Sequence, residues 1–119
     1  MLVGKFRELR VWQRSKDLAV YIYSVTGNGE FSRDFGLRDQ IRRAGVSIAS
    51  NIAEGDELNT NKQAVHFFFI AKGSTAEVLT QAIISHEIGY IDSQVLAHIQ
   101  EECDAISCML TKLIQARKR

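Results

Sequence analysis

Arginine is the side chain with the clearest chemical potential in this sequence, because its spacing places several copies on single helical faces. Arg7, Arg10 and Arg14 stand at i, i+3 and i+7. Arg38 and Arg42 stand at i and i+4, so each set lines one face of a helix. A planar guanidinium can hold a phosphate through two parallel hydrogen bonds, and phosphate contacts position proteins on nucleic acid. Both sets therefore predict binding to RNA or DNA.

The candidate nucleic-acid-binding set combines these helical faces with a basic C-terminal tail. It comprises Arg10, Arg14, Arg38, Arg42, Arg43, Lys112, Arg117, Lys118 and Arg119. A structural alternative stays open, in which Arg42 or Arg43 forms an ion pair across the bundle with Glu54 or Glu77. These two acids also belong to a set interpreted as structural, which is completed by Asn51, Gly55 and Gly73.

The formal charge is uneven along the chain, although its sum is small. Fifteen Lys and Arg residues against fourteen Asp and Glu give a net charge of +1. Residues 1–43 hold nine cations and five acids, whereas residues 44–111 hold two cations and nine acids. Residues 112–119 hold four cations and no acid. A nearly neutral protein can therefore still present a basic face to a polyanion.

Catalytic and metal-binding patterns are absent from the sequence. The three histidines are scattered, and neither an HExxH nor a CxxC spacing occurs. No local arrangement places a nucleophile beside a base. Cys103 and Cys108 fall on different faces of a helix, so they are not predicted to pair, and Cys103 is predicted to be a small core residue. The sequence predicts no enzyme, no cofactor and no metal site.

The apolar residues follow a helical period almost throughout, and the chain contains no proline. This pattern predicts helices over about 8–26, 35–55, 60–88 and 93–116, within one domain spanning 1–119. Short connections favour an all-α, antiparallel up-down-up-down four-helix bundle with left-handed packing. The longest uncharged stretch has twelve residues, 18–29, which is too short for a membrane span. With no apolar signal core near Met1, a cytoplasmic location is expected, without a membrane partner.

Two features exceed what an isolated bundle needs. Glycine inside a helix is costly, so Gly45 and Gly73 predict backbones packed too closely for a Cβ atom. Successive helical residues turn by about 100°, so Phe67, Phe68 and Phe69 cannot all face one core. At least one must lie on an outer face, where large exposed aromatics often mark a partner surface. Phe67 and Phe69 are therefore predicted to contribute to a homo-oligomer interface.

Several segments together resemble a known family. Residues 40–55 read QIRRAGVSIASNIAEG, residues 6–23 read FRELRVWQRSKDLAVYIY, and residues 66–81 read HFFFIAKGSTAEVLTQ. These segments resemble the 23S rRNA intervening-sequence proteins, which are small four-helix bundles. The resemblance covers roughly residues 6–91, and the segment ending at Gly55 is its most specific part.

The resemblance implies an architecture more directly than a role. Members assemble as ring-like homopentamers, and some are accessory proteins of diversity-generating retroelements, in which a basic pentamer surface binds nucleic acid and a reverse transcriptase. We therefore expect a non-enzymatic homo-oligomer, a pentamer by resemblance, that binds RNA or DNA through its basic residues. The alternative is a scaffold that binds another protein and no nucleic acid.

Overall fold

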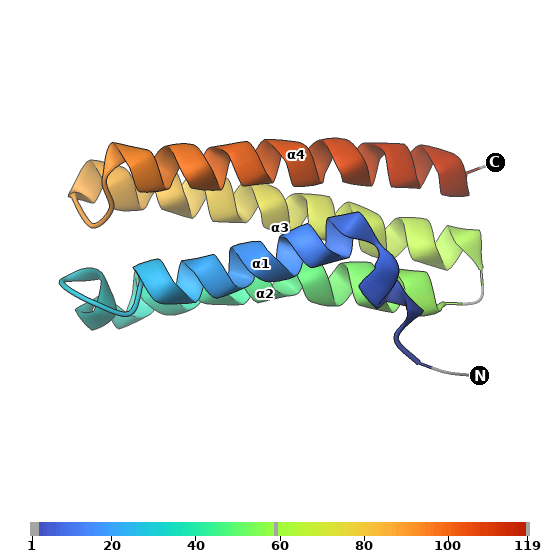
Figure 1. Ribbon diagram of the computed structural model, residues 1–119, viewed down its shortest axis with the longest axis horizontal. Helices are drawn as coiled ribbons and strands as arrows, with labels where there is room; N and C mark the ends of the chain where they lie inside the picture. Colours follow the sequence, from blue (N-terminus) through green and yellow to red (C-terminus); the bar gives the residue numbers. More distant parts are fainter. Residues whose placement is uncertain (1–2, 59, 119) are drawn as a thin grey trace.

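The computed structural model describes residues 3–58 and 60–118, and over these residues it contains helices and no strand. The four long helices are α1 (Arg10–Val25), α2 (Phe35–Glu57), α3 (Asn61–Ile88) and α4 (Ser93–Arg117). Two short 3-10 helices, η1 (Lys5–Glu8) and η2 (Phe31–Arg33), precede α1 and α2. The four helices lie side by side in a bundle about 45 Å long, with both chain ends at the same end of it (Figure 1). The predicted all-α four-helix bundle is confirmed.

Side chains that bond to free backbone N–H groups set the starts of three helices. Asp34 accepts from the Leu37 N–H, Thr60 from the Gln63 N–H, and Asp92 from the Val95 N–H. Gly89, at φ 99°, ends α3 in the left-handed conformation. Two helix boundaries differ from prediction by two residues. Helix α1 begins two residues late because the chain before it forms η1, and α2 continues two residues beyond the predicted 55, to Glu57.

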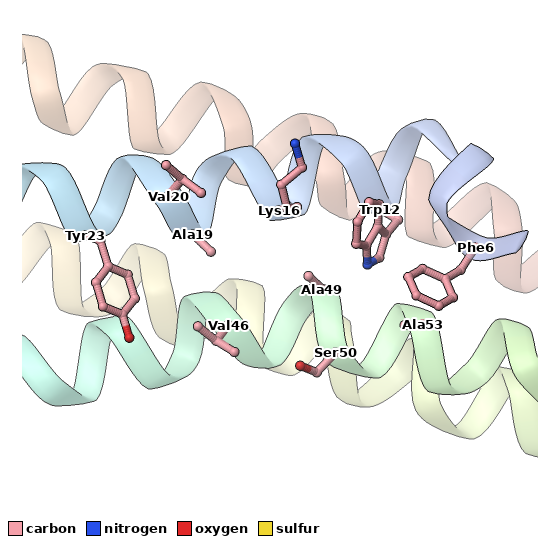
Figure 2. Close-up of a pocket in the computed structure, with 10 residues that line it drawn as sticks. All are labelled: Phe6, Trp12, Lys16, Ala19, Val20, Tyr23, Val46, Ala49, Ser50 and Ala53. Carbon is pink, nitrogen blue, oxygen red and sulfur yellow. The ribbon is translucent and has the colours of Figure 1, made fainter. Parts of the chain in front are cut away.

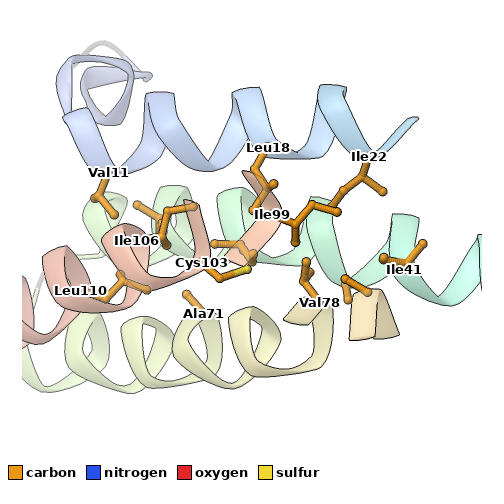
Figure 3. Packing of buried hydrophobic residues seen from close by; sticks show 14 of the residues in the cluster. Val11, Leu18, Ile22, Ile41, Ala71, Val78, Ile99, Cys103, Ile106 and Leu110 are labelled. Atoms are coloured by element: carbon orange, nitrogen blue, oxygen red, sulfur yellow. The ribbon is translucent and has the colours of Figure 1, made fainter. Parts of the chain in front are cut away.

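The core is built from the apolar stripes that the helical period predicts. Each helix contributes residues that are almost fully buried, and Figure 3 shows them meeting along the bundle axis. The labelled members are Val11, Leu18, Ile22, Ile41, Ala71, Val78, Ile99, Cys103, Ile106 and Leu110. Cys103 is 2% exposed, which confirms its predicted place in the core.

Burial makes the two cysteines chemically unequal. Burial away from water raises the pKa of the Cys103 thiol to about 12, and only a thiolate reacts readily. Cys108 is exposed on α4. We expect one thiol per chain to react with a disulfide reagent in the native protein, and two after denaturation. Rapid modification of both thiols in the native protein would contradict this placement of Cys103.

A second set of contacts joins the two connections at the end opposite the termini. Phe31, in η2, is 2% exposed and stacks against Tyr90 with ring centroids 5.1 Å apart. The Tyr90 hydroxyl donates to Asp34 at 3.0 Å, and this bond raises the Tyr90 pKa. Asp34 thus caps α2 and also bonds to the connection between α3 and α4. The sequence predicted a loop at Phe31 and did not indicate that its ring is buried.

The helix-interior glycines divide into two kinds. A Cβ atom at Gly45 would lie 2.9 Å from Ile22 Cδ1, and one at Gly55 would lie 2.7 Å from Phe68 Cε1. Close packing therefore explains these two glycines. Gly73 has no atom within 4 Å of where its Cβ would be, so its predicted close packing inside the protomer is wrong. The glycine still costs α3 about 1 kcal/mol relative to alanine.

Helix α3 is more apolar than its buried face requires. It is the one described helix long and apolar enough to cross a membrane by length and composition alone, yet here it packs as a bundle helix (Figure 1). Phe68 is fully buried, whereas Phe69 is 50% exposed. The prediction that the three phenylalanines do not share one face is confirmed. The role of Phe67 and Phe69 in a subunit interface stays a prediction.

Candidate nucleic-acid interface

Three of the nine predicted phosphate-binding residues form ion pairs, and two of these pairs join different helices. Arg14 donates two hydrogen bonds to Glu102 of α4, with Nε–Oε1 at 2.8 Å and Nη2–Oε2 at 3.0 Å. Arg117 Nη2 donates to Asp56 Oδ1 of α2 at 2.8 Å. Both acids are the more buried partners, at 15% and 12% side-chain exposure. A phosphate would have to displace a carboxylate in each case, so these two arginines hold helices together.

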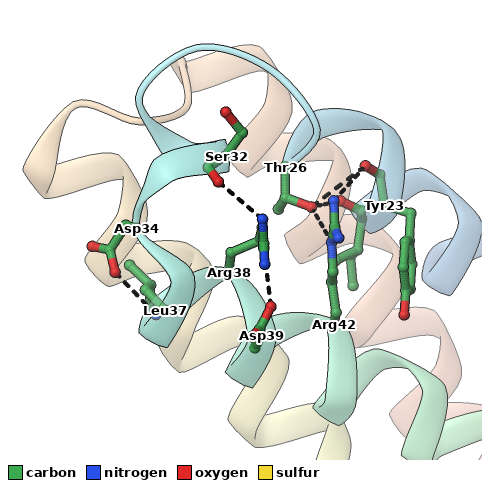
Figure 4. A network of polar contacts seen from close by, with 9 residues as sticks. Tyr23, Thr26, Ser32, Asp34, Leu37, Arg38, Asp39 and Arg42 are labelled. Atoms are coloured by element: carbon green, nitrogen blue, oxygen red, sulfur yellow. Dashed lines mark hydrogen bonds and ion pairs between the residues drawn. The ribbon is translucent and has the colours of Figure 1, made fainter.

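Arg42 is tied to the end of α1. Its Nε donates to the buried Thr26 Oγ1 at 2.8 Å, and its guanidinium lies 4.4 Å from the centre of the Tyr23 ring (Figure 4). Thr26 in turn donates to the Ile22 carbonyl at 2.7 Å. A cation at this position also interacts favourably with the negative end of the α1 dipole. The structure therefore gives Arg42 a capping role that its spacing from Arg38 did not indicate.

Arg38 is engaged nearby, across the start of α2. Its Nη1 donates to the Ser32 carbonyl and its Nε to Asp39 Oδ1, both at 2.9 Å (Figure 4). Its guanidinium also lies 4.8 Å from the centre of the exposed Phe35 ring. Arg38 thus connects η2 to α2, and it is only 24% exposed.

The structural set makes a different pattern of contacts from the one expected. Asn51 Nδ2 donates to the Ser47 carbonyl and to Ser47 Oγ, and Ser47 Oγ lies 2.9 Å from Ser74 Oγ of α3. This small network joins α2 to α3, in agreement with the structural interpretation of Asn51. Neither Glu54 nor Glu77 forms an ion pair with any described residue. The alternative in which Arg42 or Arg43 pairs with one of these acids is therefore not formed: Arg42 turns toward α1, and Arg43 has no ion pair with a described residue.

The cations without an ion pair in the described chain gather mainly at one end. Arg7 also lies at this end, but its Nε donates to the Gly4 carbonyl at 3.0 Å. We call the other five cations the terminal basic cluster, which comprises Lys5, Arg10, Lys62, Lys112 and Lys118. These residues come from η1, from the starts of α1 and α3, and from the end of α4, which all lie at the end carrying the termini (Figure 1). All five are exposed. Lys118 also lies over the Phe69 ring, at 5.4 Å.

The predicted basic residues therefore do not form one face of the protomer. Arg38, Arg42 and Arg43 lie near the start of α2, at the opposite end from Arg10 and Lys112. Arg43 is exposed and has no hydrogen bond or ion pair with another described residue. Arg119 lies outside the described residues. Lys5 and Lys62 were missed, because neither belongs to a helical stripe of cations.

A family model described as 23S rRNA-intervening sequence protein matches residues 7–112. The chain belongs to this family. One solved structure, a protein of unknown function from the S23 ribosomal protein family of Bacteroides thetaiotaomicron, superposes with a TM-score of 0.80 at 24% identity. The match covers 87% of this chain and 97% of that one, and it shows a shared fold. No curated protein matches the sequence.

The resemblance seen in the sequence is thus confirmed. Membership of the family agrees with the small helical protein that the structure describes. Among the described residues, no group of three or more His, Cys, Asp or Glu side chains is arranged to hold a metal ion.

The Arg14–Glu102 ion pair is expected to make the free energy of unfolding depend on pH. The hydrogen bond from Arg14 lowers the Glu102 pKa below its ordinary 4.5. A lowered pKa in the folded state adds stability above the ordinary pKa, and that stability is lost as pH falls through the folded value. We expect wild type to lose about 1 kcal/mol more than Glu102→Gln between about pH 7 and pH 3, after allowing for solvent screening. Urea unfolding at both pH values measures this, and equal losses would contradict the pair's role.

Proposed function

We propose that this protein is a non-catalytic nucleic-acid-binding protein that acts as a homo-oligomer and contacts phosphates through the terminal basic cluster. The observation that carries the proposal is the gathering of five exposed cations from four elements at one end of the bundle. None of the five is neutralised by an ion pair with a described acid. Lysine and arginine side chains in this state gain binding free energy by releasing counterions from nucleic acid.

Assembly strengthens this weak site by repetition. The net charge of one chain is only +1, so a single protomer attracts a polyanion weakly. In a cyclic oligomer, every copy has the same orientation to the ring axis. Bundles that stand along the axis would then display the same end on one rim, and five copies, as the family resemblance implies, would contact one nucleic acid together. Linked weak contacts of this kind multiply affinity.

The proposal narrows the residues expected to contact phosphate. Arg14 and Arg117 are neutralised by acids, and Arg38 and Arg42 are held by neighbouring groups. Of the nine predicted residues, Arg10, Lys112 and Lys118 remain in the cluster, and Lys5 and Lys62 join them.

The test compares two double variants that remove the same charge. Arg10→Gln with Lys112→Gln weakens the terminal basic cluster, whereas Arg33→Gln with Lys72→Gln removes two cations outside it. Fluorescence anisotropy of a labelled, structured RNA gives the affinity at about 50 and about 200 mM salt. We expect the cluster variant to bind about tenfold more weakly or worse, with a shallower salt dependence, and the control to bind close to wild type.

A protein-interaction scaffold is the alternative, and one observation favours it. Four of the arginines predicted to bind phosphate are already engaged within the bundle. No RNA binding by wild type at low salt would favour the scaffold and overturn the proposal. Equal weakening in both double variants would show that net charge, rather than the cluster, determines binding.

A further inference from the structure

An open apolar groove runs between the outer sides of α1 and α2. Its volume is about 480 Å³. Large side chains of α1 stand on one wall, while alanines of α2 leave the floor hollow (Figure 2). The residues that shape it are Trp12, Val20, Tyr23, Val46, Ala49 and Ala53. Val20 is 63% exposed, so the groove presents apolar surface that the protomer leaves uncovered.

A ridge of apolar side chains runs along the outer face of α3. Ile70 and Ile84 are two heptads apart, and with Ile88 they are each 40% exposed or more. Only 33% of the most apolar 18-residue stretch of α3 is buried within the bundle. Glu77 lies midway between Ile70 and Ile84 and lines a hollow with Gln40 and Arg43 of α2. The ridge therefore faces the α2 side of α3.

Gly73 marks the ridge as a place of close approach. It is exposed in the middle of a long helix, and no atom of the protomer lies near its missing Cβ. The bundle itself gives no reason for this costly residue. At Gly45 and Gly55, in contrast, the space where a Cβ atom would lie is occupied by Ile22 and Phe68 of the same chain. A neighbouring molecule that packs closely on α3 would account for Gly73.

The two surfaces carry complementary charges. Glu77 and Glu87 flank the ridge, are exposed, and have no ion pair with a described residue. Lys16, which is paired with Asp17, lines the groove, and the hollow beside it is lined by Arg42, Arg43 and one acid, Asp39, which is paired with Arg38. Arg43 also lines the hollow that holds Glu77 of the same chain, but it forms no ion pair there. Docking the ridge along the groove would therefore bring acids toward cations, which favours one orientation of the contact.

We propose that the α3 ridge of one copy of this chain docks in the α1–α2 groove of the next copy. This inference rests on the homo-oligomer of the proposed function and assigns the surfaces that form it. Groove and ridge lie on neighbouring sides of the bundle that share α2, so each protomer can use both at once. Such a head-to-tail contact turns from copy to copy and can close into a ring.

The test uses one variant for each surface, with sedimentation velocity as the readout. Val20→Glu places a charge in the groove at an exposed position, and Gly73→Gln adds a side chain to the ridge where the protomer has open space. Each variant is expected to raise the dissociation constant of assembly about 30-fold or more and to keep wild-type helicity. Phe35→Glu, at an exposed apolar site outside both surfaces, is the matched control and should assemble normally.

Mixing the two variants tests the head-to-tail geometry directly. The Val20→Glu copy retains a ridge and the Gly73→Gln copy retains a groove, so an equimolar mixture should form a one-to-one dimer that cannot grow. A mixture that stays monomeric would overturn the inference. If wild type assembles and both variants assemble equally well on their own, the assigned docking surfaces are wrong, although the homo-oligomer stands. Monomeric wild type would instead overturn the homo-oligomer of the proposed function, and this inference with it.

Discussion

Gly55→Ala is expected to destabilise the protein by about 3 kcal/mol, which lowers the melting temperature by about 10 °C. The new Cβ would lie 2.7 Å from Phe68 Cε1 and 3.1 Å from the Ala64 carbonyl oxygen. Phe68 is a rigid, fully buried ring, and the carbonyl belongs to the α3 backbone. Neither can move without shifting α3 from α2, so the overlap outweighs the helix propensity that alanine adds.

Gly45→Ala, in the same helix, is the matched control. Its Cβ would lie 2.9 Å from Ile22 Cδ1, which is the end of a side chain that can change rotamer. We expect the cost of that change to be offset by helix propensity, so that stability stays within about 1 kcal/mol of wild type. Chemical unfolding of both variants at one protomer concentration measures the contrast. Equal stabilities would show that the α2–α3 contact at Gly55 is looser than described.

Arg42→Ala is expected to destabilise the protein by about 2 kcal/mol. The substitution removes the donor to the buried Thr26 Oγ1 and the cation above the Tyr23 ring. It also removes a positive charge beside the end of α1. Chemical unfolding measures the loss, which should exceed any change in RNA affinity caused by one cation.

Arg33→Ala serves as the comparison for Arg42→Ala. Arg33 is an exposed arginine at the same end of the bundle, and its replacement should change stability by no more than about 0.5 kcal/mol. If Arg42→Ala were equally mild but abolished RNA binding, Arg42 would be a phosphate contact rather than a cap, as its sequence spacing alone suggested.

The helices and core were predictable because they depend on local pattern. Ile99, Ile106 and Leu110 belong to an apolar stripe that repeats every seven residues. The helical period alone is enough to recognise this stripe, and all three residues are buried. Capping by Thr60 and Asp92 follows from the same local chemistry. These features require no knowledge of how one helix is aligned with another.

The roles of the cations were not predictable from spacing. Arg14 and Glu102 are 88 residues apart, and their meeting depends on the alignment of α1 with α4. That alignment follows from packing over the whole bundle. Spacing shows which cations share a face of one helix, but it does not show which acid faces them from another helix. It therefore grouped Arg14 and Arg42 with Arg10, although Arg14 is paired with Glu102 and Arg42 is bonded to Thr26, whereas Arg10 has no ion pair with a described residue.

The glycines and the groove show the same limit. Gly45 and Gly73 both lie inside helices. A Cβ atom would meet Ile22 at Gly45 and no atom within 4 Å at Gly73, and this difference depends on residues distant in the sequence. The groove exists because Ala49 and Ala53 of α2 lie beside Trp12 and Val20 of α1. The sequence shows that α2 is rich in small residues. It does not show on which side of the helix these residues leave a groove.

Sedimentation velocity of a labelled, structured RNA mixed with the protein at low salt, followed at the label, tests most directly whether the oligomer binds nucleic acid. We expect the RNA to sediment with the wild-type oligomer and mostly alone with Val20→Glu, because affinity depends on repeating the terminal basic cluster. RNA that sediments alone while the wild-type protein assembles would contradict nucleic-acid binding as the function and point to the scaffold instead.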